Sequence, residues 1–222
     1  MPNFLNNVEL AGTLTIGVDD VGYDAKFFGA TSGKYMLWDE ANDALVLPDA
    51  TPIKLGTGAD LQLKHTGSQS EINSWTGDLY LTQNANNKDI IFQSDDGSNG
   101  VETYFYLDGS DSTANPQTVF PDNSFLCFGG NTTTQTGDLY IKHNGSNSFI
   151  NNYTGNLTIK NEAADKDIIF SCDDGSGGAE TYFFLDGSAS SGNPFTVFPD
   201  SSQLAFGTGN DMLLYHDGSN SY

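Results

Sequence analysis

Apolar and more polar residues alternate in short segments of the chain. Four pairs of apolar residues are each separated by a single more polar position: Leu61 and Leu63, Leu79 and Leu81, Leu139 and Ile141, and Leu157 and Ile159. The second pair follows the first by 18 residues, and the fourth follows the third at the same spacing. Alternation with a period of two is typical of a half-buried β-strand. The pattern therefore predicts a short strand at each of the four positions.

Turn-forming dipeptides separate these segments. Gly-Ser, Asn-Gly and Asp-Gly sequences recur between them, and the chain contains 25 glycines. These residues favour tight turns. The best helix candidate, residues 161–165, aligns with the loop-like residues 83–87, so we expect no helix of useful length. The expected fold class is all-β, built of short strands and tight turns as closely spaced hairpins or as the rungs of a solenoid.

A long internal repeat underlies the expected organisation. Residues 64–122 align with residues 142–200 at a constant offset of 78, with 37 identities in 59 positions. A third copy begins near the C-terminus, where residues 206–209 (FGTG) resemble residues 55–58 (LGTG). A repeat unit that cannot bury its own apolar face must stack on its neighbours or on partner chains. We therefore expect a repeat-containing fibre, either a β-solenoid or an intertwined trimeric β-prism.

The repeat divides the chain into four expected parts. Residues 1–50 lie outside it and are expected to form an N-terminal β module. Residues 51–128 are the first repeat, residues 129–206 the second, and residues 207–222 the start of a third. Because this third copy is incomplete, either the chain continues beyond its last residue here or it stops before the repeat closes.

The charge balance excludes several classes of function. The chain has 29 acidic and 8 basic side chains and a net charge of -21. Nucleic-acid binding needs clustered Lys and Arg, so no nucleic-acid partner is expected. There is no apolar run of about 18 residues and no signal-peptide pattern, so we expect neither membrane insertion nor Sec export. The two cysteines, Cys127 and Cys172, are expected to be reduced thiols.

The three histidines occupy equivalent positions in the three copies, at His65, His143 and His216. A general base is needed once, beside a nucleophile, whereas a residue that recurs in every repeat serves the repeat. We therefore expect these side chains to form hydrogen bonds at a strand end before the turn, and we expect no catalytic residues and no enzyme. The alternative is that three symmetry-related imidazoles meet on a trimer axis and hold a metal ion.

Two acidic pairs, Asp95-Asp96 and Asp173-Asp174, are each followed by Gly-Ser. Carboxylates in flexible loops are typical Ca²⁺ ligands, but the spacing departs from the Asp-x-Asp-x-Asp-Gly pattern of a calcium loop. The expected role is an Asx-type turn between two strands. No metal site and no cofactor is predicted for the chain.

Clustered aromatic residues are the remaining candidates for a binding surface. They are Tyr104, Tyr106, Tyr182 and Phe184, which lie beside acidic and amide residues in the two repeats. Aromatic rings bury large areas, so the first interpretation is core packing or an interface between chains. The second interpretation is a glycan-binding surface, since aromatic faces flanked by Asp and Asn are a common way to hold sugars.

Two parts of the chain resemble a known family. Residues 12–20 (GTLTIGVDD) with 23–40 (YDAKFFGATSGKYMLWDE) are similar to a module of virion structural proteins and tail fibres of tailed phages, marine ones especially. Residues 215–222 (YHDGSNSY) resemble a rung that recurs in such fibres. The resemblance implies a rod-like, usually homotrimeric, all-β appendage displayed on the virion.

The leading hypothesis is therefore a virion tail fibre whose residues 1–50 attach to other virion proteins and whose repeats act as a spacer in host attachment. Trimerisation would also hide strand edges that otherwise template aggregation. One alternative is a capsid decoration or head fibre, and another is an adhesin module that binds a host-surface receptor or glycan. A depolymerase is disfavoured, because each candidate acid pair is duplicated, whereas glycoside hydrolysis needs two acids in distinct roles.

Overall fold

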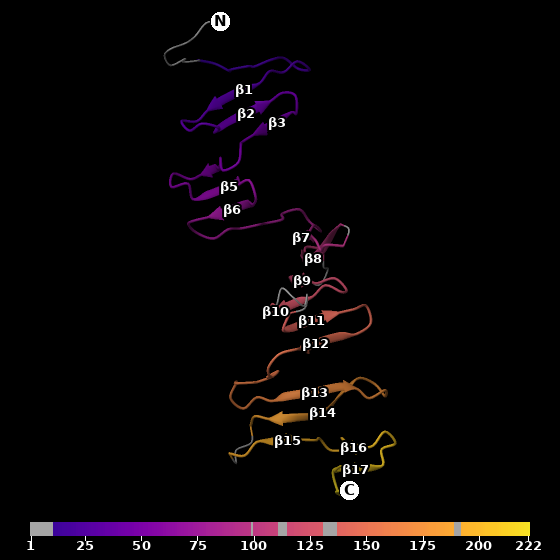
Figure 1. Cartoon of the computed structure of the whole chain (residues 1–222). Coiled ribbons are helices and arrows are strands. Elements are labelled where there is room, and N and C mark those ends of the chain that lie inside the picture. The colour runs from indigo at the N-terminus through magenta and orange to yellow at the C-terminus, as the bar shows by residue number, and fades with distance from the viewer. Residues whose placement is uncertain (1–10, 99, 111–114, 131–136, 189–191) are drawn as a thin grey trace. The chain divides into compact units, whose positions relative to one another are not determined.

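The computed structural model describes residues 11–98, 100–110, 115–130, 137–188 and 192–222. These residues form short strands and turns, and no helix occurs among them (Figure 1). The predicted all-β class is thereby confirmed. The part of the chain that the structure describes contains no helix that is long and apolar enough to cross a membrane. Residues 1–10 of the predicted N-terminal module lie outside the described residues.

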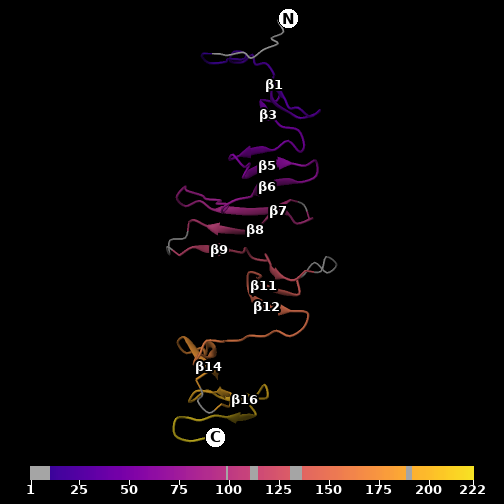
Figure 2. The same cartoon turned by 90° about the vertical axis from the view of Figure 1, so that its left-hand side faces the viewer.

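Each sheet is antiparallel and is built from strands that follow one another in the sequence (Figures 1 and 2). The chain divides into two compact units, residues 1–90 with 108–117 and residues 91–107 with 118–222. The first unit holds two three-stranded sheets: β1 (Ala25–Phe28), β2 (Tyr35–Asp39) and β3 (Ala44–Val46), then β4 (Ile53–Leu55), β5 (Leu61–His65) and β6 (Ser70–Ser74).

The sheet of β7 (Ile90–Asp95), β8 (Val101–Asp108) and β9 (Gln117–Val119) contributes residues to both units. The second unit also contains two further three-stranded sheets and one pair of strands. These are β10 (Leu126–Phe128), β11 (Leu139–His143) and β12 (Ser148–Asn152), then β13 (Ile168–Asp173), β14 (Ala179–Asp186) and β15 (Phe195–Val197), and last β16 (Leu204–Phe206) with β17 (Met212–Leu214).

Strand pairing recurs at the spacing of the sequence repeat. In β5 and β6, Leu63 pairs with Ile72 and His65 with Ser70. In β11 and β12, the residues 78 positions later, Ile141 with Ile150 and His143 with Ser148, form the same pairs. The same residue types thus give the same hairpin register in both copies.

Two of the four predicted strands are present and two are not. Residues 61–63 lie in β5 and residues 139–141 in β11, as predicted. Residues 79–81 and 157–159 belong to no strand, so the prediction for these positions is wrong. A strand requires a hydrogen-bonded neighbour as well as an alternating pattern. Within each three-stranded sheet the central strand, β5 or β11, already has a neighbour on both edges.

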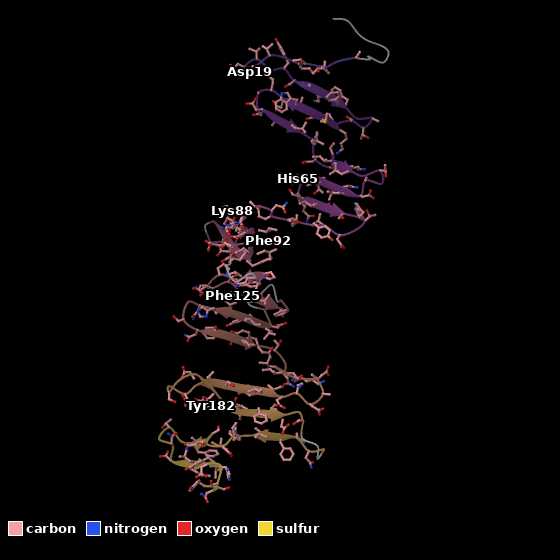
Figure 3. The ribbon with its side chains drawn as sticks, turned by 180° about the vertical axis from the view of Figure 1, so that it is seen from behind. Asp19, His65, Lys88, Phe92, Phe125 and Tyr182 are labelled. Atoms are coloured by element: carbon pink, nitrogen blue, oxygen red, sulfur yellow. The ribbon has the colours of Figure 1, made fainter. Side chains whose placement is uncertain are left out.

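The sheets expose apolar residues on both faces. Among the described residues, Tyr140 is the one buried hydrophobic side chain, with 6% of its surface exposed. Consecutive strand residues point to opposite faces. Phe27 and Phe28 of β1 are both exposed, and so are Ile169 and Phe170 of β13. Figure 3 shows side chains standing on both sides of the ribbons. A single described sheet therefore has no closed core of its own.

Candidate interaction surface

A row of three phenylalanine rings crosses the sheet of β7, β8 and β9. Phe92 stacks on Phe105 with a centroid separation of 4.5 Å, and Phe105 stacks on Phe120 at 5.7 Å. Phe92 is in β7, Phe105 is in β8 and Phe120 directly follows β9. We call this row the phenylalanine ladder. Stacked rings at such separations stabilise one another beyond their buried area.

The ladder recurs in the second repeat with the same geometry. Phe170 stacks on Phe183 at 4.5 Å, and Phe183 stacks on Phe198 at 5.7 Å. Phe170 pairs across the strands with Phe183, so the two rings share one face of the sheet. Phe170 and Phe198 are exposed, as are Phe92 and Phe120 of the first copy. Both ladders therefore present aromatic surface that no described residue covers.

The face that carries the ladder is the same in both copies. Five apolar positions contribute to it, and all five are identical between the repeats: Ile90 and Ile168, Phe92 and Phe170, Phe105 and Phe183, Leu107 and Leu185, and Phe120 and Phe198. The opposite face is less strictly repeated: Ile91 and Val119 recur as Ile169 and Val197, but Tyr106 is replaced by Phe184 and Gln117 by Phe195. We call it the variable face.

Of the aromatic residues predicted as a binding surface, Phe184 pairs with Ile169 on the variable face, with Tyr106 as its equivalent, whereas Tyr182, the equivalent of Tyr104, lies at an irregularity of the pairing between β13 and β14. Tyr104 and Tyr106 alternate with Phe105 along β8, and Tyr182 and Phe184 alternate with Phe183 along β14. Tyr104 and Tyr182 are 45% and 44% exposed, whereas Tyr106 and Phe184 are half-buried. The Ser124 and Ser202 hydroxyls donate hydrogen bonds to the carbonyl oxygens of Tyr104 and Tyr182, at 2.6 and 2.5 Å.

The three histidines lie at equivalent positions of the repeat, before a turn. His65 and His143 are the last residues of β5 and β11, and Nδ1 of each is 3.1 Å from the Oγ of a serine in the next strand, Ser70 and Ser148. His216 Nδ1 instead lies 3.0 Å from Asp200 Oδ1.

The main chain of each histidine is also held in the same way. Its carbonyl oxygen accepts a hydrogen bond from the residue after a Pro-Asp turn, Ala50, Asn123 or Ser201, at 2.6 to 2.8 Å. The structure thus places His65 and His143 at the strand ends expected from the sequence, whereas His216 lies beyond β17 in an isolated bridge with Ser221. No cluster of three or more metal-ligating side chains is present within the described residues of one chain.

The two acidic pairs close the hairpins between β7 and β8 and between β13 and β14. Asp95 Oδ1 accepts a hydrogen bond from the Gly97 N–H at 2.6 Å, and Asp96 Oδ1 accepts from both the N–H and the hydroxyl of Ser98. These are the expected Asx turns. The hydrogen bond from the Ser98 hydroxyl, followed by that from its N–H, lowers the pKa of Asp96, and Ser176 lowers the pKa of Asp174 in the same order.

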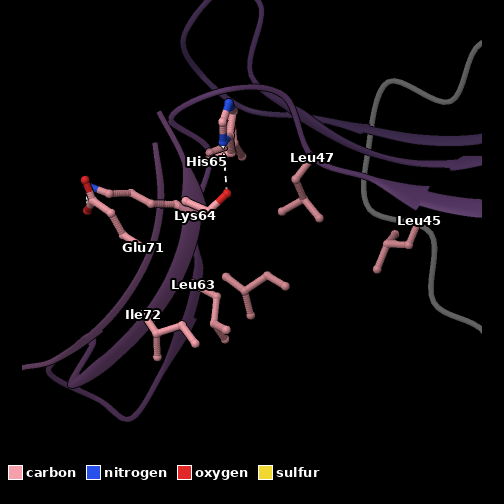
Figure 4. Close-up of a pocket in the computed structure, with 10 residues that line it drawn as sticks. Leu45, Leu47, Leu63, Lys64, His65, Glu71 and Ile72 are labelled. Atoms are coloured by element: carbon pink, nitrogen blue, oxygen red, sulfur yellow. Dashed lines mark hydrogen bonds and ion pairs between the residues drawn. The ribbon is translucent and has the colours of Figure 1, made fainter. Parts of the chain in front are cut away.

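A pocket of about 490 Å³ lies beside β5 and β6 (Figure 4). Its apolar side is formed by leucine and isoleucine side chains that include Leu45, Leu63 and Ile72. Its polar side carries His65 and an ion pair in which Lys64 Nζ is 3.2 Å from Glu71 Oε2. In the second repeat a phenylalanine replaces this glutamate, and Lys142 Nζ lies 4.4 Å from the ring centroid of Phe125. The repeats therefore do not share this pocket's ion pair.

Comparisons with known proteins identify no relative. No protein-family model, no curated protein and no solved structure matches the chain. Functional inference therefore rests on the chemistry of the surfaces described above.

The sequence analysis named Tyr104 and Tyr106 of β8 but did not single out the ladder. The ladder residues Phe92 and Phe120 are 28 positions apart in the sequence, so no local cluster marks them. A comparison of alternate positions between the repeats carries the signal, because the ladder face is identical and the other face is not.

Proposed function

We propose that this chain is a structural component of a phage virion: a homotrimeric, non-enzymatic fibre whose repeats form a rod-like spacer used in host attachment. Its residues 1–50 attach to other virion proteins. The observation that carries the proposal is the phenylalanine ladder, an exposed aromatic face that recurs with the sequence repeat. The resemblance of residues 12–40 and 215–222 to phage fibre modules supplies the virion context.

Another copy of the chain is the partner that fits the ladder best. A surface that repeats every 78 residues needs a partner with the same period, and a second copy in register has that period. Because both sheet faces expose apolar side chains, association removes apolar area from water, which is the dominant favourable term in most protein association. Closed threefold symmetry gives every copy the same contacts and leaves no ladder uncovered.

The sheet topology supports a spacer. Each sheet uses strands that are consecutive in the sequence, so such units can be added along a chain without changing those already present. The net charge of -21 makes neighbouring fibres repel one another and keeps closely spaced fibres soluble.

A second candidate function is glycan recognition by the variable face. Tyr106 and Phe184 lie there, and the neighbouring Tyr104 and Tyr182, which take no part in the ladder, are exposed. A glycan array with the assembled protein tests this candidate. Binding that is lost in a Tyr104→Ala/Tyr182→Ala variant supports it, and an array without binding at high protein concentration contradicts it.

Native mass spectrometry tests the main proposal. We expect a species of three chains, each of 23.8 kDa, that persists after boiling in detergent and that appears as rods by electron microscopy. A monomer that unfolds in one cooperative transition at all protein concentrations would contradict the proposal, because it would mean that each chain closes its own core.

A further inference from the structure

Two segments have the sequence pattern of a strand but no strand partner among the residues that the structure describes. They are residues 78–82 (DLYLT) and residues 156–160 (NLTIK), which occupy equivalent positions in the two repeats. We call them the unpaired segments. In Figure 1 they belong to the long connections between β6 and β7 and between β12 and β13.

The main chain of both segments is free to pair. No hydrogen bond of the described residues involves an N–H or C=O group of residues 78–82 or 156–160, and every residue in them is exposed. The nearest main-chain hydrogen bonds before them are accepted by the carbonyl oxygens of Thr76 and Gly155, from the side chains of Ser74 and Asn152, and those after them are donated by the N–H groups of Ala85 and Ala163.

The two segments are bounded by the same turns. Gly77 and Gly155 precede them with φ angles of 69° and 65°, and Asn87 and Asp165 follow with φ angles of 57°. No residue within either segment has a positive φ angle. The conformation of an irregular loop can differ between copies of a repeat. In this chain, by contrast, the same backbone turns flank the same alternating residues in both copies. The segments are therefore positioned parts of the repeat.

Their side chains favour association. Leu79 and Leu81 alternate with a tyrosine, and Leu157 and Ile159 alternate with a threonine, so one side of each segment is aliphatic. Leu81 is 59% exposed and Ile159 is 63% exposed. Each segment carries one charged side chain, Asp78 or Lys160, in a chain with 29 acidic residues. An extended, weakly charged segment with open main-chain groups is a template for strand pairing with another chain.

We propose that the unpaired segments are strands completed by another copy of the chain, each pairing through its main chain with an outer strand of a neighbouring copy. This inference rests on the proposed self-association and specifies one of its contacts. A second copy is the occupant because the segments recur at the repeat spacing and because each sheet of the described residues ends in outer strands that have no further strand beside them. The phenylalanine ladder and these strands are separate contacts, one through side chains and the other through the main chain.

Hydrogen exchange of the assembled wild-type protein, read by peptide mass spectrometry, tests the pairing. We expect the amides of residues 79–82 and 157–160 to exchange at least about 100-fold more slowly than the exposed turn at Gly97 and Ser98. Strands β5 and β11, paired within the chain, are the protected reference. Exchange in the segments as fast as in the turn overturns the inference.

A pair of double variants separates main-chain pairing from side-chain packing. Tyr80→Pro/Thr158→Pro removes one N–H from each segment, whereas Tyr80→Ala/Thr158→Ala removes the side chains and keeps the N–H groups. We expect the proline variant to lower the trimer fraction in native mass spectrometry at least about 10-fold relative to the alanine variant. Equal trimer fractions in the two variants overturn the inference.

Photo-cross-linking identifies the partner chain. With p-benzoylphenylalanine in place of Tyr80, ultraviolet light should produce covalent dimers on a denaturing gel, with the cross-link in an outer strand of the second chain. Cross-links confined to one chain overturn the inference. If the wild-type protein is a trimer and these tests fail, the inference fails while the proposed function stands. If the wild-type protein is a monomer, the proposed function itself fails.

Discussion

At the scale of single residues, the chain uses short polar side chains to define its turns. Asp96 and Asp174 each accept two hydrogen bonds from a serine two positions later, and both have a lowered pKa. The duplication of these acids, which argues against catalysis, has a structural explanation: each closes one hairpin. The same holds for the histidines, which occupy one position before a turn in three copies.

The lowered pKa values predict a loss of stability in acid. A carboxyl whose pKa is lower in the folded state stabilises the fold above its unfolded pKa, and this contribution is lost as pH falls through the folded value. For Asp96 and Asp174 the loss therefore begins near the ordinary value of 3.8 and is completed below it. We expect the thermal midpoint to fall over this range.

The Asp96→Asn/Asp174→Asn variant is the matched control, because asparagine keeps a side-chain acceptor but does not titrate in this range. Its thermal midpoint should fall less steeply with acid than that of the wild type. Identical acid profiles for the two proteins would contradict the role given to these carboxylates.

Among single side chains, we expect the removal of Tyr140 to lower the free energy of unfolding most. Tyr140 is 6% exposed, its ring centroid lies 5.0 Å from that of Phe125, and its hydroxyl accepts a hydrogen bond from Asn151 Nδ2 at 2.6 Å. Tyr140→Ala should lower the free energy of unfolding by about 2–4 kcal/mol, measured by denaturant titration at fixed protein concentration. The control is Tyr23→Ala, at an exposed position, and an equal effect of both variants would contradict the burial argument.

At the scale of elements, each long hairpin is tied at its base by a repeated contact. The Gly109 N–H donates to Asp89 Oδ1 at 3.0 Å, and the Gly187 N–H donates to Asp167 Oδ1 at 2.9 Å. A Cβ atom at Gly109 would collide with the carbonyl oxygen of Lys88, and one at Gly187 with that of Lys166. The lack of room for a Cβ atom, and not a positive φ angle, therefore requires glycine directly after β8 and β14.

Alanine at these glycines should open the base of the hairpins. We expect Gly109→Ala and Gly187→Ala each to cost about 1–3 kcal/mol of stability, because the collision is with main-chain atoms that cannot turn away. Gly130→Ala, at a position with nothing within 4 Å of the added atom, is the control. Thermal unfolding measures the difference, and unchanged stability in the two hairpin variants would show that the strands shift to accept the methyl group.

The element scale is also where sequence reasoning failed in part. Residues 61–63 and 79–81 have the same alternation, but only the first segment is in a strand. Alternation shows which side chains share a face, whereas a strand also depends on a hydrogen-bonded neighbour from another segment of the chain or from another chain. The sequence therefore predicted the side-chain pattern of residues 79–81 correctly and their pairing within the chain incorrectly.

At the scale of the whole molecule, the exposed ladder predicts which substitutions disrupt assembly. Phe105→Asp/Phe183→Asp places a carboxylate in each ladder, where a partner would bury it, and burial of an unpaired charge is strongly unfavourable. We expect this variant to shift from trimer to monomer, measured by analytical ultracentrifugation.

Tyr104→Asp/Tyr182→Asp changes the neighbouring residues of the same strands, outside the ladder, and carries the same charge. It should remain a trimer. If the tyrosine variant dissociates while the phenylalanine variant stays a trimer, the contact between chains is made by the tyrosines and not by the ladder.

The all-β class, the 78-residue repeat, the turn positions and the histidines before the turns could all be read from the amino-acid sequence, because each depends on residues close together in the chain. Glycine, Asp and Asn set turns locally, and alternation sets which side chains share a face. The stacking of Phe92, Phe105 and Phe120, and the lack of a partner for residues 79–81, appear only in the folded chain. Both depend on which strands become neighbours, and that choice is made by hydrogen bonding between segments distant in sequence.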